Sequence, residues 1–249
     1  MIDIHSHILP GMDDGADTME ASLFMAELAV NSGVDQMIVT PHCNVEGIFE
    51  NYYDETFLTC YQEFECAVQR SKLPLTVWPG MEVYATDEVP ELLRQGKLIS
   101  LNHSRYFLIE FNFYEDTDFI EALLWEILKT GYHPIVAHPE RYPLVQRHPE
   151  LVCGWLEAGA SVQVNKGSVL GSFGNRARDT AMELLEHHLV AVIASDAHSP
   201  YRRTTDLSEV YQQVQRFYGF RYAQILFNEN PRRIVHNLDL LHLQIPSIL

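Results

Sequence analysis

The chain has 249 residues and a net charge of −17, from 17 Lys and Arg against 34 Asp and Glu. This length suits one α/β barrel or two smaller domains. Hydrophobic residues make up 47% and charged residues 20%, which excludes a disordered or fibrous protein. The acidic balance, without a basic stripe, argues against binding to nucleic acid. No apolar run has the length of a membrane helix, and charged residues begin near position 1, so we expect a cytoplasmic protein without membrane insertion.

The four cysteines indicate a reducing compartment. Cys43, Cys60, Cys66 and Cys153 contain no C-x-x-C pair and are too few for a disulfide-stapled secreted fold. We therefore interpret them as small hydrophobic residues.

Short apolar runs alternate with longer helix-like segments, a pattern typical of βα units around a parallel sheet. The expected strands are residues 2–5, 36–40, 75–79, 106–110, 134–137, 161–164 and 190–194. The expected helices are residues 19–32, 118–130, 148–157, 175–187 and 205–218. The first helix has Asp17 or Thr18 as its cap and ends at Gly33. No linker rich in Gly, Ser or Pro divides the chain, so we expect one α/β domain over residues 1–249.

Histidines and carboxylates stand at the carboxyl end of nearly every expected strand. They recur at intervals of 27 to 40 positions, about one βα unit, when Asn165 marks the sixth strand. In a closed parallel barrel, the carboxyl ends of all strands open onto one face, so these side chains should meet in one site. In chain order they are His5 and His7, His42, Glu82, Glu110, His138, and Asp196 with His198.

The first strand carries the most suggestive pair. His5 and His7 are two positions apart, so on a regular strand both point to the same side and can bind one ion. The acidic turn that follows contains Asp13 and Asp14. We prefer Asp14 as the ligand because it adjoins the flexible Gly15.

With Asp14 included, nine Asp, Glu and His residues share this position and have no stabilising role without cations. One divalent ion takes about four to six ligands, so nine donors imply two or three ions. Imidazole and carboxylate ligands without thiolate favour Mn, Fe or Zn.

The expected net charge at the metal site indicates a negatively charged substrate. Four carboxylates and three divalent ions would leave a positive barrel mouth on an acidic protein, which suits a phosphate dianion. We therefore expect phosphoester hydrolysis, with hydroxide formed from metal-bound water attacking phosphorus. Arg141 and Arg203 are the candidates for planar contacts to phosphoryl oxygens.

The sequence excludes cysteine-based phosphatase chemistry and does not support the usual modes of nucleotide binding. The cysteine phosphatases need C-x5-R, but the residues six positions after the four cysteines are Phe49, Cys66, Lys72 and Gly159. The chain also has neither a G-x-x-x-x-G-K-[ST] loop nor a G-x-G-x-x-G motif.

Seven motifs occur in an order that resembles one family. They are MIDIHSHILPGMDDGA at the start, TPHCN at 40–44, PGMEV at 79–83, IEF at 109–111, AHPER at 137–141, NKGSVLGSFG at 165–174 and ASDAH at 194–198. The chain thereby resembles, over residues 1–205, the bacterial manganese-dependent tyrosine-protein phosphatases of capsular and exopolysaccharide loci. These belong to the polymerase and histidinol phosphatase (PHP) superfamily. The resemblance implies a distorted seven-stranded (β/α) barrel, a trinuclear manganese centre, and hydrolysis of phosphotyrosine on a partner tyrosine autokinase that controls polysaccharide assembly.

The resemblance also implies roles for individual residues. The phosphate-contacting arginines correspond to Arg141 and to Arg203, with Arg202 as the alternative. Independently of the resemblance, a tyrosine phenol leaves readily, and His198 or a metal-bound water would assist it. Residues 44–70 match no family pattern. The implied metal ligands are His5, His7, Asp14, His42, Glu82, Glu110, His138, Asp196 and His198.

Three alternatives stay open. Histidinol phosphatases and polymerase-associated exonucleases belong to the same superfamily, although the missing basic surface disfavours a nuclease. Amidohydrolases also begin with H-x-H, but Glu110 occupies the place of their bridging lysine. A metal-binding scaffold that docks to a kinase is the non-enzymatic alternative, and an oligomer is compatible with each.

Overall fold

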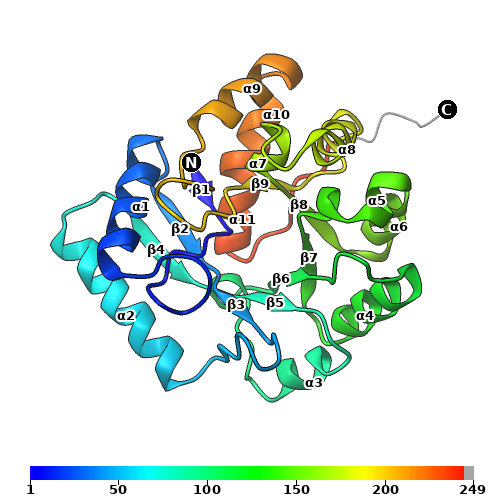
Figure 1. Ribbon diagram of the computed structural model, residues 1–249. Helices are drawn as coiled ribbons and strands as arrows, with labels where there is room; N and C mark the ends of the chain where they lie inside the picture. The colour runs from blue at the N-terminus through cyan, green and yellow to red at the C-terminus, as the bar shows by residue number, and fades with distance from the viewer. Residues whose placement is uncertain (244–249) are drawn as a thin grey trace.

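The structure is a computed structural model that describes residues 1–243. Parallel strands lie at the centre of the molecule and helices surround them (Figure 1). They form a three-stranded sheet of order β1-β2-β4 and a six-stranded sheet of order β3-β5-β6-β7-β8-β9. The strands are β1 (Ile2–Asp3), β2 (Gln36–Val39), β3 (His42–Cys43), β4 (Thr76–Pro79), β5 (Glu82–Tyr84), β6 (Tyr106–Glu110), β7 (His133–Ala137), β8 (Ser161–Asn165) and β9 (Val192–Ala194).

Two of the expected strands are longer than predicted and interrupted in the middle. Pro41 separates β2 from β3, and the Pro79-Gly80 pair separates β4 from β5; proline lacks the N–H that a sheet ladder needs. A Cβ on Gly80 would lie 2.7 Å from Cγ2 of Ile38, so the neighbouring strand requires glycine there. Each interrupted pair fills one strand position, which gives seven positions in all.

The last strand position meets the first just beyond β9 and β1. Ser6 forms a parallel bridge with Ala197, the Asp196 N–H donates to the His5 carbonyl (2.9 Å), and the buried Asp3 carboxylate accepts from the Ser195 N–H (3.0 Å). Side-chain and backbone contacts thus replace a regular ladder between β9 and β1. The predicted distorted (β/α)7 barrel is confirmed.

All five predicted helices are present as α1, α4, α6, α8 and α9, although α6 and α9 each begin three residues later than expected. Thr18 caps α1, and its side chain accepts from the Ala21 N–H. The helices are α1 (Met19–Asn31), α2 (Glu55–Arg70), α3 (Val89–Arg94), α4 (Thr117–Lys129), α5 (Pro143–Arg147), α6 (Leu151–Ala158), α7 (Lys166–Val169), α8 (Asn175–Glu186), α9 (Ser208–Tyr218), α10 (Phe220–Gln224) and α11 (Asn230–Val235), with shorter turns η1 (Leu101–His103), η2 (Pro139–Arg141) and η3 (Ile225–Glu229).

Helix α2 lies in a stretch for which no helix was predicted. The Asp54 side chain caps it by accepting from the Thr56 and Phe57 N–H groups, and Phe57 and Phe64 are buried against the core. The segment between Cys43 and Arg70 is therefore a connection followed by a regular outer helix.

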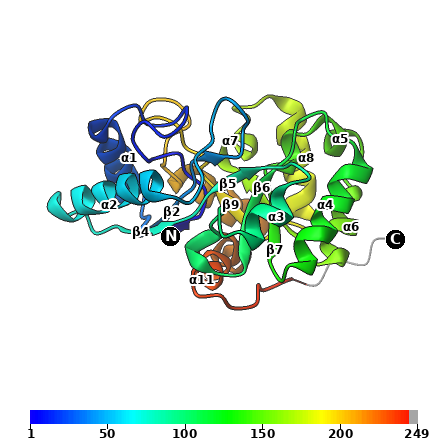
Figure 2. The ribbon, with the colours of Figure 1, turned by 90° about the horizontal axis from the view of Figure 1, so that it is seen from below.

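Helix α11 closes one end of the ring. Its Ile234 and Val235 pack with Ile4, Leu108 and Ile135 in a buried apolar cluster separate from the larger core that contacts the outer helices. Figure 2 shows α11 at the end of the barrel opposite α7, which follows the carboxyl end of β8. The open end is therefore the end where the strands finish. Within residues 1–243, none of the helices has both the length and the apolar composition needed to cross a bilayer.

Candidate metal centre

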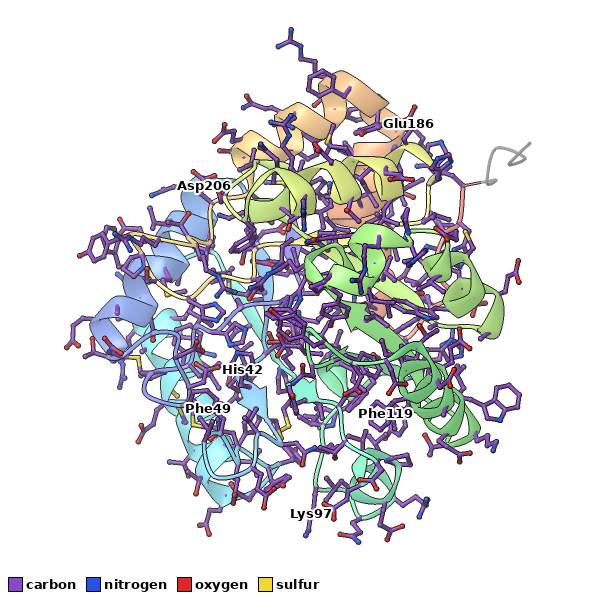
Figure 3. All side chains as sticks on the ribbon, turned by 45° about the vertical axis from the view of Figure 1, so that its right-hand side comes forward. His42, Phe49, Lys97, Phe119, Glu186 and Asp206 are labelled. Atoms are coloured by element: carbon purple, nitrogen blue, oxygen red, sulfur yellow. The ribbon has the colours of Figure 1, made fainter. Side chains whose placement is uncertain are left out.

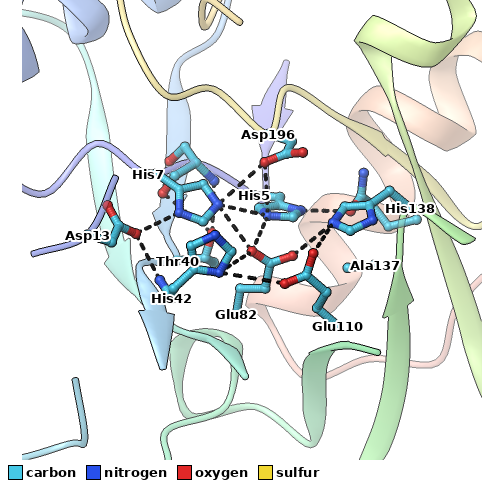
Figure 4. Close-up of polar contacts among 12 residues, drawn as sticks. His5, His7, Asp13, Thr40, His42, Glu82, Glu110, Ala137, His138 and Asp196 are labelled. Atoms are coloured by element: carbon cyan, nitrogen blue, oxygen red, sulfur yellow. Dashed lines mark hydrogen bonds and ion pairs between the residues drawn. The ribbon is translucent and has the colours of Figure 1, made fainter. Parts of the chain in front are cut away.

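The nine predicted donor side chains meet at the carboxyl ends of the strands. Figure 4 labels all of them except Asp14 and His198. They form four overlapping groups, and within each group the ligand atoms lie within 4.8 Å of one another. The groups are His7, Asp14, His42 and His198; His5, His7 and Asp196; His5, Glu82 and His138; and His42, Glu82 and Glu110.

Glu82 is the centre of this cluster. Its Oε2 lies 3.2 Å from His5 Nε2, 3.2 Å from His7 Nε2 and 3.1 Å from His42 Nδ1. Its Oε1 lies 3.1 Å from His138 Nε2. One carboxylate therefore contacts four imidazoles from three strand positions, which suits a ligand that bridges cations.

Several donor atoms of this cluster lack hydrogen-bond partners within residues 1–243, and divalent cations would satisfy them. Glu82 Oε2 and Asp196 Oδ1 are buried and accept no hydrogen bond from the described residues, and His5 Nε2 and His7 Nε2 lie only 3.2 Å apart. Buried polar atoms are normally paired, so these converging lone pairs point to positive charge between them. This geometry supports the expectation that these residues bind cations.

Burial in this cluster shifts the pKa values of Glu110 and His138 toward their neutral forms. Burial raises the pKa of Glu110 to about 8, and the negative charges of Glu82 and Asp196 add to this. Burial lowers the pKa of His138 to about 4, so its imidazole is neutral at pH 7. A neutral imidazole is the form that binds metal, and bound cations would favour the ionised carboxylate.

A second layer of polar side chains orients the donors. His5 Nδ1 contacts Gln163 Oε1 (2.8 Å), Gln163 Nε2 donates to Asn165 Oδ1 (2.8 Å), and Asn165 Nδ2 donates to Asp196 Oδ2. With its proton on Nδ1, His5 turns the Nε2 lone pair toward the cluster. Asn165 was expected only as the residue that ends the sixth strand, and no role was predicted for Gln163.

Asp13 orients His7 in the same way. Its Oδ2 lies 2.6 Å from His7 Nδ1 and accepts from the His42 N–H (2.8 Å), while Oδ1 accepts from the Gly15 N–H (2.9 Å). The two neighbouring aspartates therefore differ: Asp14 faces His42 and His198 as a potential ligand, and Asp13 contacts the far side of His7. The backbone at Gly15 packs directly against His7, and only glycine fits there because a Cβ would lie 2.0 Å from the His7 carbonyl oxygen.

Asp13→Asn is expected to weaken metal affinity by about ten- to hundredfold, the usual cost of losing a carboxylate that orients a metal-binding histidine. Metal titration of the chelator-treated protein measures this. Asp87→Asn, which removes an exposed carboxylate, is the control. Equal affinity of the Asp13 variant and the control would contradict the orienting role.

The two predicted arginines lie beside Asp196. Arg203 Nη2 is 2.5 Å and Arg141 Nη1 is 3.5 Å from Asp196 Oδ2. Arg141 lies between the rings of Phe113 and Phe173, at 4.9 and 4.5 Å from their centroids, and Arg203 is 5.6 Å from Phe173. Aromatic faces hold both guanidinium planes in place.

Arg202, the alternative to Arg203, does not join this group. Its side chain is exposed, and its backbone N–H and carbonyl contact Ser199 Oγ. The geometry therefore favours Arg203.

Three site residues have left-handed backbone conformations: His138 (φ 35°), Asp196 (φ 49°) and Arg203 (φ 50°). Such conformations are costly for residues other than glycine and concentrate at functional sites.

His198 follows Asp196 closely, and its Nδ1 lies 3.1 Å from the Asp196 carbonyl oxygen, which turns Nε2 toward Asp14. This orientation favours a ligand role for His198.

His42 lies at the mouth of the site, where its ring stacks on Phe49 with centroids 5.7 Å apart (Figure 3). Phe49 comes from the segment after β3, which matched no family pattern. Its contact with a candidate ligand is a role that the sequence analysis did not find.

Comparison with known proteins identifies the family. The family model described as "Capsular polysaccharide synthesis, CpsB/CapC" matches residues 1–236. The chain belongs to the CpsB/CapC family. This family member is 35% identical over 237 residues to the tyrosine-protein phosphatase YwqE of Bacillus subtilis, which covers 95% of this chain and 92% of YwqE.

Two further matches agree. The CpsB/CapC family member is 32% identical over 242 residues to the tyrosine-protein phosphatase CpsB of Streptococcus agalactiae, covering 95% of this chain and 99% of that protein. Its fold matches a chain from the crystal structures of YwqE from Bacillus subtilis and CpsB from Streptococcus pneumoniae, described as unique metal-dependent tyrosine phosphatases. The TM-score is 0.93 at 33% identity, and the match covers 100% of both chains. The resemblance and the PHP-type fold inferred from the motifs are confirmed.

Proposed function

We propose that this protein is a metal-dependent tyrosine-protein phosphatase that hydrolyses phosphotyrosine on a tyrosine autokinase of capsular or exopolysaccharide synthesis, in the cytoplasm and with Mn²⁺ as its metal. The main support is the convergence of nine imidazole and carboxylate donors with two aromatic-stacked arginines. Membership of the CpsB/CapC family supports the choice of phosphotyrosine.

The donor set would hold two or three divalent ions. His5, His7 and Asp196 form one buried group that would hold an ion, and the group of His7, Asp14, His42 and His198 includes the exposed Asp14. When bound, such ions lower the pKa of coordinated water and neutralise charge on phosphoryl oxygens.

The arginines bind and orient the phosphoryl group. Arg141 and Arg203 both reach Asp196 Oδ2 from the same side of the centre, and their remaining N–H groups are available for two phosphoryl oxygens. Phe173 supports both guanidinium planes, so the two contacts keep a fixed spacing. This arrangement stabilises negative charge as it develops during phosphoryl transfer.

A phenol is the leaving group that this site suits best. Tyrosine has a pKa of about 10 and leaves far more readily than an aliphatic alkoxide, so a strong general acid is less necessary. Since both nitrogens of His198 face oxygen atoms of Asp14 and Asp196, His198 is better placed as a ligand than as the proton donor.

Removal of metal is expected to abolish hydrolysis of p-nitrophenyl phosphate and of phosphotyrosyl peptides, because the carboxylate cluster alone would repel a phosphate dianion. Activity is measured before chelation, after chelation, and after adding back Mn²⁺, Fe²⁺ or Zn²⁺ separately, together with the metal content per chain. Activity that survives complete metal removal would overturn the proposal.

A parallel assay with histidinol phosphate separates the two phosphatase hypotheses. Faster turnover of histidinol phosphate than of phosphotyrosyl peptides would favour a small-molecule phosphatase. Binding of a tyrosine kinase without metal-dependent phosphate release would favour a scaffold.

A further inference from the structure

A cleft of about 380 Å³ opens directly beside the candidate metal centre. It lies between the first turns of α1 and the loop after His198, and its lining includes Asp17, Glu20, Phe24, His198 and Tyr201. Its volume falls in the range of pockets that bind small ligands or side chains. His198 belongs to both the cleft and the donor cluster, so the cleft adjoins the metal centre and is within reach of residues next to a group held there.

Two aromatic side chains form the outer wall of the cleft. Phe24 is 40% and Tyr201 is 82% exposed, and their rings make an edge-to-face pair with centroids 6.0 Å apart. Exposed aromatic residues beside a cleft are typical of binding surfaces, where they contact extended chain and aliphatic stems.

The charge of the cleft is negative. Asp17 and Glu20 are exposed at its rim, and no Lys or Arg is present among the residues that line it. The cleft therefore repels a phosphate group, which belongs on the arginine side with Arg141 and Arg203. It attracts a positive charge a short distance from that phosphate.

We propose that this cleft binds the substrate residues that flank the phosphotyrosine and selects a Lys or Arg among them. The aliphatic stem of that side chain packs on Phe24 and Tyr201, and its charged head meets Asp17 and Glu20. This inference rests on the proposed tyrosine phosphatase function and adds a substrate preference to it. The acidic surface of the protein favours the same basic partner segment.

The test compares phosphotyrosyl peptides that differ only in their flanking residues: Lys on the amino side, Lys on the carboxyl side, Ala on both sides, or Glu on both sides. We expect kcat/KM for at least one Lys peptide to exceed the Ala value by about fivefold, as partly exposed ion pairs allow, and the Glu peptide to be the poorest substrate. All peptides are assayed beside p-nitrophenyl phosphate, which has no flanking residues.

The variant Asp17→Asn/Glu20→Gln is expected to reduce the preference for Lys to less than about twofold and to leave p-nitrophenyl phosphate hydrolysis unchanged. Glu27→Gln removes an exposed carboxylate from the same helix outside the cleft and is the matched control. Phe24→Ala should lower kcat/KM for every peptide but not for p-nitrophenyl phosphate.

The outcomes are distinguishable. Equal kcat/KM for all peptides in the wild type, or a Lys preference that persists in the double variant, would overturn the selectivity while the phosphatase function stands. Metal-dependent hydrolysis of p-nitrophenyl phosphate with no hydrolysis of any peptide would overturn the protein substrate, and this inference with it.

Discussion

Glu82→Gln is expected to lower kcat/KM for p-nitrophenyl phosphate by about a thousandfold, comparable to the loss of a main electrostatic contributor to the transition state. Glu82 is buried and contacts His5, His7, His42 and His138. A glutamine keeps the shape but removes the charge and one acceptor oxygen, so a carboxylate no longer contacts the four imidazoles. Metal content per chain, measured with activity, should fall by at least one ion.

Glu121→Gln, an exposed change on α4, is the control and should retain full activity and metal content. Circular dichroism and thermal melting establish that the Glu82 variant still folds. A folded Glu82→Gln protein with normal turnover would contradict the proposed role of this carboxylate at the centre.

Arg141→Lys is expected to lower kcat/KM for phosphotyrosyl peptides and p-nitrophenyl phosphate by about ten- to hundredfold. A charge-assisted hydrogen bond is worth about 1.5–3 kcal/mol, and an ammonium cannot reproduce the planar two-point contact or the packing between Phe113 and Phe173. Steady-state kinetics with the metal-loaded enzyme measure the loss, and the metal content should be unchanged.

Arg203→Lys should give a loss of similar size, and the double variant should lose less than the product of the two, because both arginines contact Asp196 and Phe173. Arg202→Lys is the matched control, since its side chain is exposed beside them in the chain. A larger loss in Arg202→Lys than in Arg203→Lys would reverse the assignment of the second arginine.

The architecture and the donor positions could be predicted because both follow from periodic features. The apolar run of residues 106–109 is bounded by Arg105 and Glu110, and β6 occupies the predicted residues 106–110. Since parallel strands finish on one face, the residues that follow them, such as His138 and Asp196, had to converge once the ring formed.

The sequence did not predict features that depend on distant contacts. Strands β3 and β5 have two and three residues, too short for a periodic signal, and exist because they pair with each other in register.

Helix α2, by contrast, could have been predicted from local signals, namely the Asp54 cap and the spacing of Phe57 and Phe64.

The residues that orient the donors, Gln163 and Asn165, are only weakly indicated by the sequence pattern of β8. Gln163 and Asn165 alternate with Val162 and Val164 on a strand that is buried throughout, and the valines pack in the outer core. A polar residue at every second position of a buried strand indicates that one face needs hydrogen-bond partners. Which donors they contact depends on the closed ring.

The junction between β1 and β9 has a consequence for biosynthesis. His5 and His7 emerge from the ribosome early, whereas Asp196 and His198 are among the last donors to be made, so a nascent chain holds only a partial set of ligands for most of translation. Contacts so far apart in sequence form late and slowly. Cation uptake is therefore coupled to the completion of the fold, and a truncated or stalled product that lacks the last strand would hold only a partial centre.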